Sequence, residues 1–108
     1  MTTTYKVLGQ QAPSATTNTD LYTVPGATST VVSTLAIANR GVSTTYRVAV
    51  RPAGTAIANQ HYIVYDATIS SGDSIFLTIG ITLATTDVVT VYAGTASLSF
   101  SLFGSELT

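Results

Sequence analysis

The sequence predicts an all-β protein: a single antiparallel β-sandwich or jelly-roll-like domain of about eight strands that spans residues 1–108. Glu, Lys and Gln, which favour helices, are sparse, whereas Thr, Val, Ile and Tyr, which fit a pleated surface, are frequent. Apolar and hydroxyl side chains alternate with a period of two in several segments. Turn signals separate these segments at intervals of about 8–12 residues, which is typical of sandwiches and barrels.

The first two expected strands are short. Tyr5–Leu8 is the first, and Leu21–Val24 is the second, which ends at a Pro-Gly turn. The residues between them, 9–18, are mostly small or polar. We expect this segment to form a polar connector or arm.

A hairpin-like turn is expected between the next two strands. Thr30–Asn39 is predicted to place Val31, Leu35 and Ile37 on one face. An Asn-Arg-Gly turn then leads into Ser43–Arg51. In that strand the two faces alternate, with Tyr46, Val48 and Val50 on the core side and Arg47, Ala49 and Arg51 on the other.

Four more strands are expected in the C-terminal half. Tyr62–Ala67 is apolar on both faces, which is typical of a strand covered on both sides. Asp73–Leu83 contains Gly80, which predicts a bulge or bend within that strand. Thr86–Ala93 and Ala96–Phe103 follow. The last has the clearest alternation, with Leu98, Phe100 and Leu102 on one face and Ser97, Ser99 and Ser101 on the other.

The charge content is low. Charged residues make up 8% of the chain and the net charge is −1, whereas charged residues are about 25% of an average domain. Charge normally protects a soluble protein from self-association, so we expect partners to cover much of this surface. A Thr/Ser-coated surface that is simply uncharged is the alternative. Near-neutrality argues against nucleic-acid binding, which needs a basic field.

The residues needed for catalysis or metal binding are few and scattered. His61 is the only histidine, Asp66 is expected to point to the opposite side of the same strand, and no Gly-x-Ser-x-Gly elbow presents a nucleophile. The acidic residues lack the spacing of a calcium loop, and Asp73 and Asp87 are expected to cap turns. Cysteine is absent. We therefore predict a protein that is not an enzyme and has no cofactor and no metal site.

No apolar run approaches the roughly 20 residues that span a bilayer, and the N-terminus lacks the pattern of a secretory signal. We therefore expect no membrane partner, and a protein that is kept in the cytoplasm or released by lysis.

Three of the four basic residues, Arg40, Arg47 and Arg51, lie within twelve residues of one another. Arg47 and Arg51 share a strand face, and Arg40 is in the preceding turn. The cluster is interpreted as a protein-docking patch for carboxylates on a partner, with His61 as a further interfacial residue. The alternative is a solvated face whose long stems cover apolar surface.

The succession of sequence segments along the expected strands resembles that of a family of small virion proteins of tailed bacteriophages, cyanophages among them. The resemblance covers nearly the whole chain from about Tyr5. Its N-terminal part is carried by Tyr22-Thr23-Val24-Pro25, Val31-Val32-Ser33-Thr34, Ala38-Asn39-Arg40-Gly41 and Tyr46-Arg47-Val48-Ala49-Val50-Arg51. It continues through His61-Tyr62-Ile63, Tyr65-Asp66, the stretch from Leu83 to Tyr92, and Phe103-Gly104-Ser105-Glu106.

The resemblance implies a structural role in the virion, which is assembled in the host cytoplasm. The first hypothesis is a capsid cement or decoration protein that stabilises the assembled shell, bound to the major capsid protein or other virion proteins and forming a homo-oligomer, with a trimer expected. The second is a tail-fibre or baseplate module, either an adaptor or a receptor- or glycan-binding tip. Such a tip should display clustered aromatic residues beside Asp or Asn. The tyrosines here fall mostly within strands, which favours core or interface positions.

Overall fold

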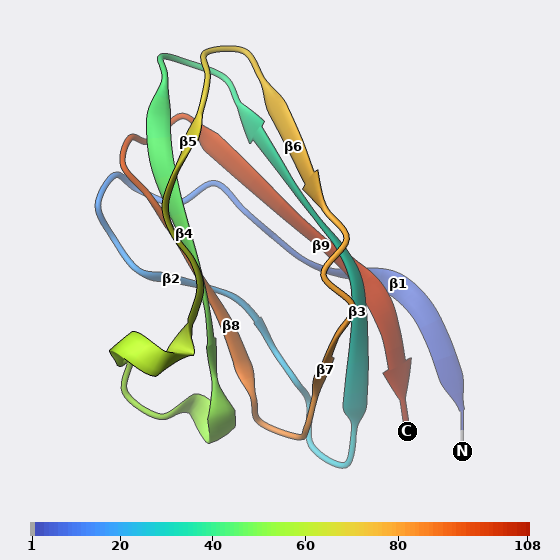
Figure 1. Ribbon diagram of the computed structural model, residues 1–108. Coiled ribbons are helices and arrows are strands. Elements are labelled where there is room, and N and C mark those ends of the chain that lie inside the picture. The colour runs from blue at the N-terminus through green and yellow to red at the C-terminus, as the bar shows by residue number, and fades with distance from the viewer. Residues whose placement is uncertain (1) are drawn as a thin grey trace.

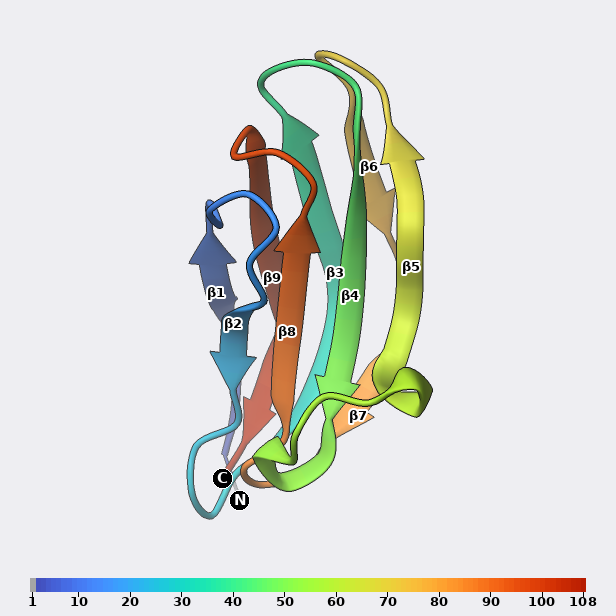
Figure 2. The same cartoon turned by 90° about the vertical axis from the view of Figure 1, so that its left-hand side faces the viewer.

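Two antiparallel sheets pack face to face in the computed structural model, which describes residues 2–108 (Figure 1). Sheet A has the strand order β1 (Thr3–Gln11), β9 (Leu98–Leu107), β3 (Ser29–Asn39) and β6 (Ser74–Leu77), and β7 (Ile81–Leu83) also pairs with β3. Sheet B has the order β2 (Thr19–Thr23), β8 (Val88–Ala93), β4 (Thr44–Arg51) and β5 (Tyr62–Ile69). Figure 2 shows sheet B in front of sheet A. The predicted all-β sandwich is confirmed.

Each of the eight predicted segments contains a strand, and one of them contains two. The segment 73–83 forms β6 and β7, which both pair with β3. Between them the chain bends at Gly80, which has φ +53°, a left-handed conformation that glycine adopts without steric cost. The predicted bend at Gly80 is therefore confirmed. Two 3₁₀ turns, η1 (Pro52–Gly54) and η2 (Asn59–His61), connect β4 to β5.

The connector predicted over residues 9–18 begins three residues later in the structure, at residue 12. Gly9, Gln10 and Gln11 continue β1 and pair with β9 as far as Phe100, so only residues 12–18 connect β1 to β2. At Gly9 a Cβ atom would lie 2.1 Å from the carbonyl oxygen of Leu21, so only glycine fits there. Gln10 and Gln11 resemble loop residues in the sequence because they are polar. They nevertheless belong to an edge strand, which backbone hydrogen bonds hold in place while its side chains are exposed to water.

The predicted core position of Val31 is wrong. A bulge in β3 between Val32 and Thr34 shifts the register with β9, and on its N-terminal side the faces are exchanged. Val32 is consequently buried and Val31 is exposed, whereas Leu35 and Ile37 lie in the core as predicted.

The prediction that Tyr62–Ala67 is covered on both faces is also wrong. This segment belongs to β5, which is an edge strand of sheet B. Val64 and Ala67 pack against the core, but Ile63 and Tyr65 are exposed. The apolar residues therefore give β5 an exposed aromatic and aliphatic surface.

The core lies between the two sheets and is almost entirely apolar. Its largest fully buried side chains are Phe100, Leu35, Ile37, Ile69, Leu98 and Leu102. The predicted alternation of the last strand is confirmed, because Leu98, Phe100 and Leu102 are all buried.

A buried polar network interrupts the core beside β1 and β2. The Tyr22 hydroxyl donates to the Glu106 carboxylate at 2.5 Å and lies 2.8 Å from the Thr30 hydroxyl. Lys6 Nζ reaches the other Glu106 oxygen at 3.1 Å. Burial, and then the neighbouring Glu106, raise the pKa of Tyr22 to about 12. The Tyr22 hydrogen bond, and then Lys6, hold the pKa of Glu106 below its usual value.

Polar side chains also hold the turns at both ends of the sandwich. The buried Asn39 amide donates to three carbonyl oxygens, those of Val42, Ile69 and Ser70. Asp87 accepts from the backbone amides of Ala53 and Ala84. Asp73 accepts from the amide of Ser74. The predicted turn-capping roles of Asp73 and Asp87 are confirmed.

Candidate functional site

The three arginines of the predicted docking patch lie on two different sheets. Arg47 and Arg51 share the outer face of sheet B, opposite the core residues Tyr46 and Val48, as predicted. Arg40 follows β3 in sheet A, where it donates to the Ser99 hydroxyl at 2.9 Å and to a carbonyl of the β8–β9 turn. The structure therefore brings two of the three together and leaves the third on the other sheet.

Arg47 is held by its own chain. Its guanidinium makes two hydrogen bonds to the Asp66 carboxylate, at 2.6 and 3.3 Å. It also lies over the rings of Tyr65 and Tyr92, at 4.3 and 4.2 Å from their centres. The hydrogen bond to Asp66 raises the pKa of Arg47 above its ordinary value. This arginine connects β4 to both of its neighbouring strands.

Arg51 is likewise engaged within the chain. It donates to Asp20 at 2.8 Å, to the Thr90 hydroxyl at 3.0 Å and to the carbonyl oxygens of Gly54 and Thr55. These contacts join β2, β8 and the η1 turn to β4. Docking a partner carboxylate on Arg47 or Arg51 would have to compete with these bonds, so the interface role of the patch stays a prediction.

His61 lies in the η2 turn, half-buried, where its Nδ1 atom accepts a hydrogen bond from the Ala58 amide at 3.1 Å. Asp66 is bound to Arg47 rather than to this imidazole. Residues 2–108 bring together no group of three or more His, Asp or Glu side chains that are placed to hold a metal ion. The interfacial role expected for His61 stays a prediction.

The outer face of sheet A is almost without charge. Its five strands contain only two charged residues, Lys6 and Glu106, which pair with each other, and the Glu106 carboxylate is buried towards the core. Arg40 is at one end of this face. Phe76 and Tyr5 stand out from its two edge strands with exposed fractions of 70% and 84%. Between them the outward-facing positions are mostly small or hydroxylated, including Ala36, Ala38, Ser99, Ser101 and Ser105.

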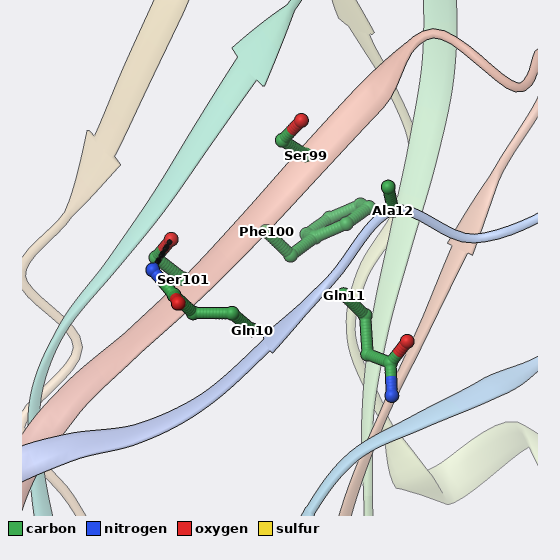
Figure 3. A pocket seen from close by; sticks show the side chains of 6 residues that line it. All are labelled: Gln10, Gln11, Ala12, Ser99, Phe100 and Ser101. Carbon is green, nitrogen blue, oxygen red and sulfur yellow. Dashed lines mark hydrogen bonds between the residues drawn. The ribbon is translucent and has the colours of Figure 1, made fainter.

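One shallow hollow of about 310 Å³ opens on sheet A where β1 leaves β9 (Figure 3). Figure 3 shows Gln10 reaching the Ser101 hydroxyl, a hydrogen bond of 3.2 Å, and the ring of Phe100 extending towards Ala12. Its lining combines the polar side chains of Gln10, Gln11, Ser99 and Ser101 with the apolar Ala12 and Phe100, and no charged residue contributes. It belongs to the same uncharged face as Phe76 and Tyr5.

A second hollow, of about 360 Å³, lies on sheet B and is lined by Asn59, Tyr62 and Tyr65. The expectation that the tyrosines occupy core or interface positions holds for Tyr22 and Tyr46, which are buried. Tyr62, Tyr65 and Tyr92 instead gather on the outer face of sheet B. The sequence alone does not reveal this cluster, because Tyr92 comes from a strand distant along the chain and a bulge turns Tyr65 outward.

No protein-family model, curated protein sequence or solved structure matches this chain. Within residues 2–108, the structure has no helix of the length and hydrophobicity that a membrane span requires.

Proposed function

We propose that this protein is a non-enzymatic structural protein of a tailed-bacteriophage virion, and that it acts as a capsid cement or decoration protein. The observation that carries the proposal is the outer face of sheet A, a nearly uncharged surface that exposes Phe76 and Tyr5. The sequence resemblance to small virion proteins supports the same assignment.

The outer face of sheet A suits a stable contact with a protein shell. Burying a charged side chain in an interface costs free energy unless an opposite charge or hydrogen-bond partner compensates it. The only charged side chains on the strands of sheet A, Lys6 and Glu106, already pair with each other. Exposed aromatic rings supply apolar area, and the serine hydroxyls of β9 supply hydrogen bonds. The outer face of sheet B, with four charged side chains, is less suited to this role.

Binding to this face would stabilise the shell by mass action. A protein that binds the assembled shell and not its free subunits lowers the free energy of the assembled state. A homo-oligomer placed on a symmetry axis of the shell, with a trimer expected, would contact several capsid subunits at once.

A tail-fibre or baseplate module is the second candidate. The exposed tyrosine cluster on sheet B favours it, because a receptor-binding tip displays aromatic residues on its surface. The copy number in the virion separates the two candidates. Quantitative mass spectrometry of purified virions should find on the order of hundreds of copies for a decoration protein, since such proteins follow the many repeats of the shell. A count between six and a few tens would place the protein in the tail, and complete absence would overturn both candidates.

A further inference from the structure

Tyr62 and Tyr65 form an aromatic corner on the outer face of β5. Their ring centres are 4.9 Å apart and their planes meet at 83°. Together with Asn59 they line the hollow of about 360 Å³ on sheet B. Tyr65 is 58% exposed. A ring-shaped ligand can therefore lie against one tyrosine face while the second ring closes the side of the hollow.

A bulge in β5 builds this corner. Tyr46 pairs with Ala67 and Val48 pairs with Val64, so β5 has one extra residue opposite Arg47. The extra residue lets Tyr65 and Asp66 both reach the Arg47 guanidinium, one by stacking and one by ion pairing. Asp66 adopts φ +51° at the bulge, a conformation that is uncommon for residues other than glycine.

One wall of the hollow is positioned by contacts within the chain. Arg47 is clamped between the rings of Tyr65 and Tyr92 and is fixed by two bonds to Asp66. Contacts of this kind hold the Tyr65 ring in one position without the help of a ligand. A preorganised aromatic site loses less conformational entropy on binding than a mobile one.

The chemistry of the hollow is aromatic and polar, with no unbalanced charge. The positive charge of Arg47 is matched by Asp66, which leaves no free cation to attract an anion. Within residues 2–108, the Asn59 amide and the hydroxyls of Tyr62 and Tyr65 make no hydrogen bond, so they remain open to a ligand.

We propose that this hollow binds a neutral carbohydrate, with a pyranose ring stacked on the face of Tyr65 that is turned away from Arg47. The C–H groups of a pyranose face carry partial positive charge and pack against the negative face of an aromatic ring. The sugar hydroxyls are both donors and acceptors, and the Asn59 amide and the tyrosine hydroxyls, which line the hollow, offer both functions. An acidic sugar would find no unpaired cation here, and a purely apolar ligand would leave these polar groups without partners.

The carbohydrate site and the proposed docking surface are on opposite outer faces of the sandwich (Figure 1). A copy that docks through sheet A would present Tyr62 and Tyr65 away from the shell. The inference rests on sheet B alone, so it stands or falls independently of the proposed role in the capsid.

The test is a glycan-array screen of the purified protein, followed by an NMR titration with the best neutral oligosaccharide. We expect binding to neutral hexose-containing glycans, with amide shifts confined to residues 59–66 and 92. Tyr65→Ala should weaken binding at least tenfold through loss of stacking, and Asn59→Ala about threefold. The matched control is Tyr5→Ala, which removes an even more exposed tyrosine from sheet A and should leave binding unchanged.

Thermal unfolding checks that each variant is folded. If Tyr65→Ala does not fold, Asn59→Ala still tests the site, because Asn59 is exposed and its replacement should not disturb the fold. Three results would overturn the proposal. The first is an array with no neutral glycan bound. The second is glycan binding that Tyr65→Ala and Asn59→Ala leave intact. The third is a titration in which a proline-rich peptide shifts residues 59–66 and the neutral oligosaccharide does not, which would assign the corner to a peptide instead. None of these three results changes the copy number expected in the virion, so the proposed role in the capsid is tested separately.

Discussion

The two outer faces of this sandwich use the few charges of the chain in opposite ways. The strands of sheet B carry Asp20, Arg47, Arg51 and Asp66, and all four form ion pairs on the outer face, one between β4 and β5 and one between β4 and β2 across β8. The strands of sheet A carry only Lys6 and Glu106, whose ion pair is at the edge of the core. The difference indicates that the charged side chains of sheet B are paired within the chain, whereas sheet A leaves an uncharged face available for a partner.

The largest expected effect contrasts the two sides of a single strand of sheet A. Phe100 is fully buried, and Phe100→Ala should reduce the free energy of unfolding by about 3–5 kcal/mol, because it leaves a cavity in the core. Ser99→Ala, one position away on the outer face, should cost less than about 0.5 kcal/mol. Chemical denaturation of both variants measures the difference. Equal losses would mean that the outer face of sheet A is as closely packed as the core.

The buried Glu106 network should make stability depend on pH at both extremes. The pKa of Glu106 is lowered in the folded protein, so its contribution is present above the ordinary pKa and is lost as the pH falls through the folded value. The pKa of Tyr22 is raised from 10.0 to about 12, so its contribution is lost as the pH rises from 10 towards 12. Thermal unfolding across this range should show both losses.

Two substitutions separate the contributions to this network. Glu106→Gln should remove most of the loss in acid. Tyr22→Phe should cost about 1–3 kcal/mol at neutral pH, because the Glu106 Oε2 atom and the Thr30 hydroxyl lose their partner while Lys6 keeps its bond to Oε1. An acid profile of Glu106→Gln identical to that of the wild type would show that the network does not couple to folding.

The arginines of sheet B provide a smaller effect. The double change Arg47→Ala, Arg51→Ala removes two partly exposed ion pairs and two contacts with aromatic rings, and should lower stability by about 1–3 kcal/mol. Arg40→Ala on sheet A should cost less than about 0.5 kcal/mol. Since these arginines serve sheet B itself, the double variant should still bind the shell. A double variant that is as stable as the wild type but no longer binds would restore the arginine docking patch predicted from the sequence.

The sequence predicts the strands well because side-chain alternation is a local signal. Leu98, Phe100 and Leu102 alternate with serine, and their burial follows directly. The wrong burial predictions occur where the pairing between two strands changes register. The bulge after Val32 exposes Val31, and the bulge at Asp66 exposes Tyr65. A bulge depends on how two strands pair, and a single strand's sequence does not reveal it.

The candidate site was harder to predict for the same reason. The sequence groups Arg40, Arg47 and Arg51 because they are close along the chain, but the turn between β3 and β4 crosses from sheet A to sheet B. The partners of Arg47 come from positions 65, 66 and 92, which no spacing rule connects. The low charge of the strands that form sheet A was visible in the sequence, although its meaning depended on knowing which strands form that sheet.

The most direct test of the account places one negative charge on each outer face. Phe76→Glu changes an exposed position on the β6 edge of sheet A, and Thr68→Glu changes an exposed position on the β5 edge of sheet B. Binding of each folded variant to purified shells that lack the protein is then measured. Phe76→Glu should weaken binding at least tenfold, because docking would bury an unpaired carboxylate, and Thr68→Glu should bind like the wild type. Wild-type binding by Phe76→Glu would contradict the assignment of sheet A as the docking surface.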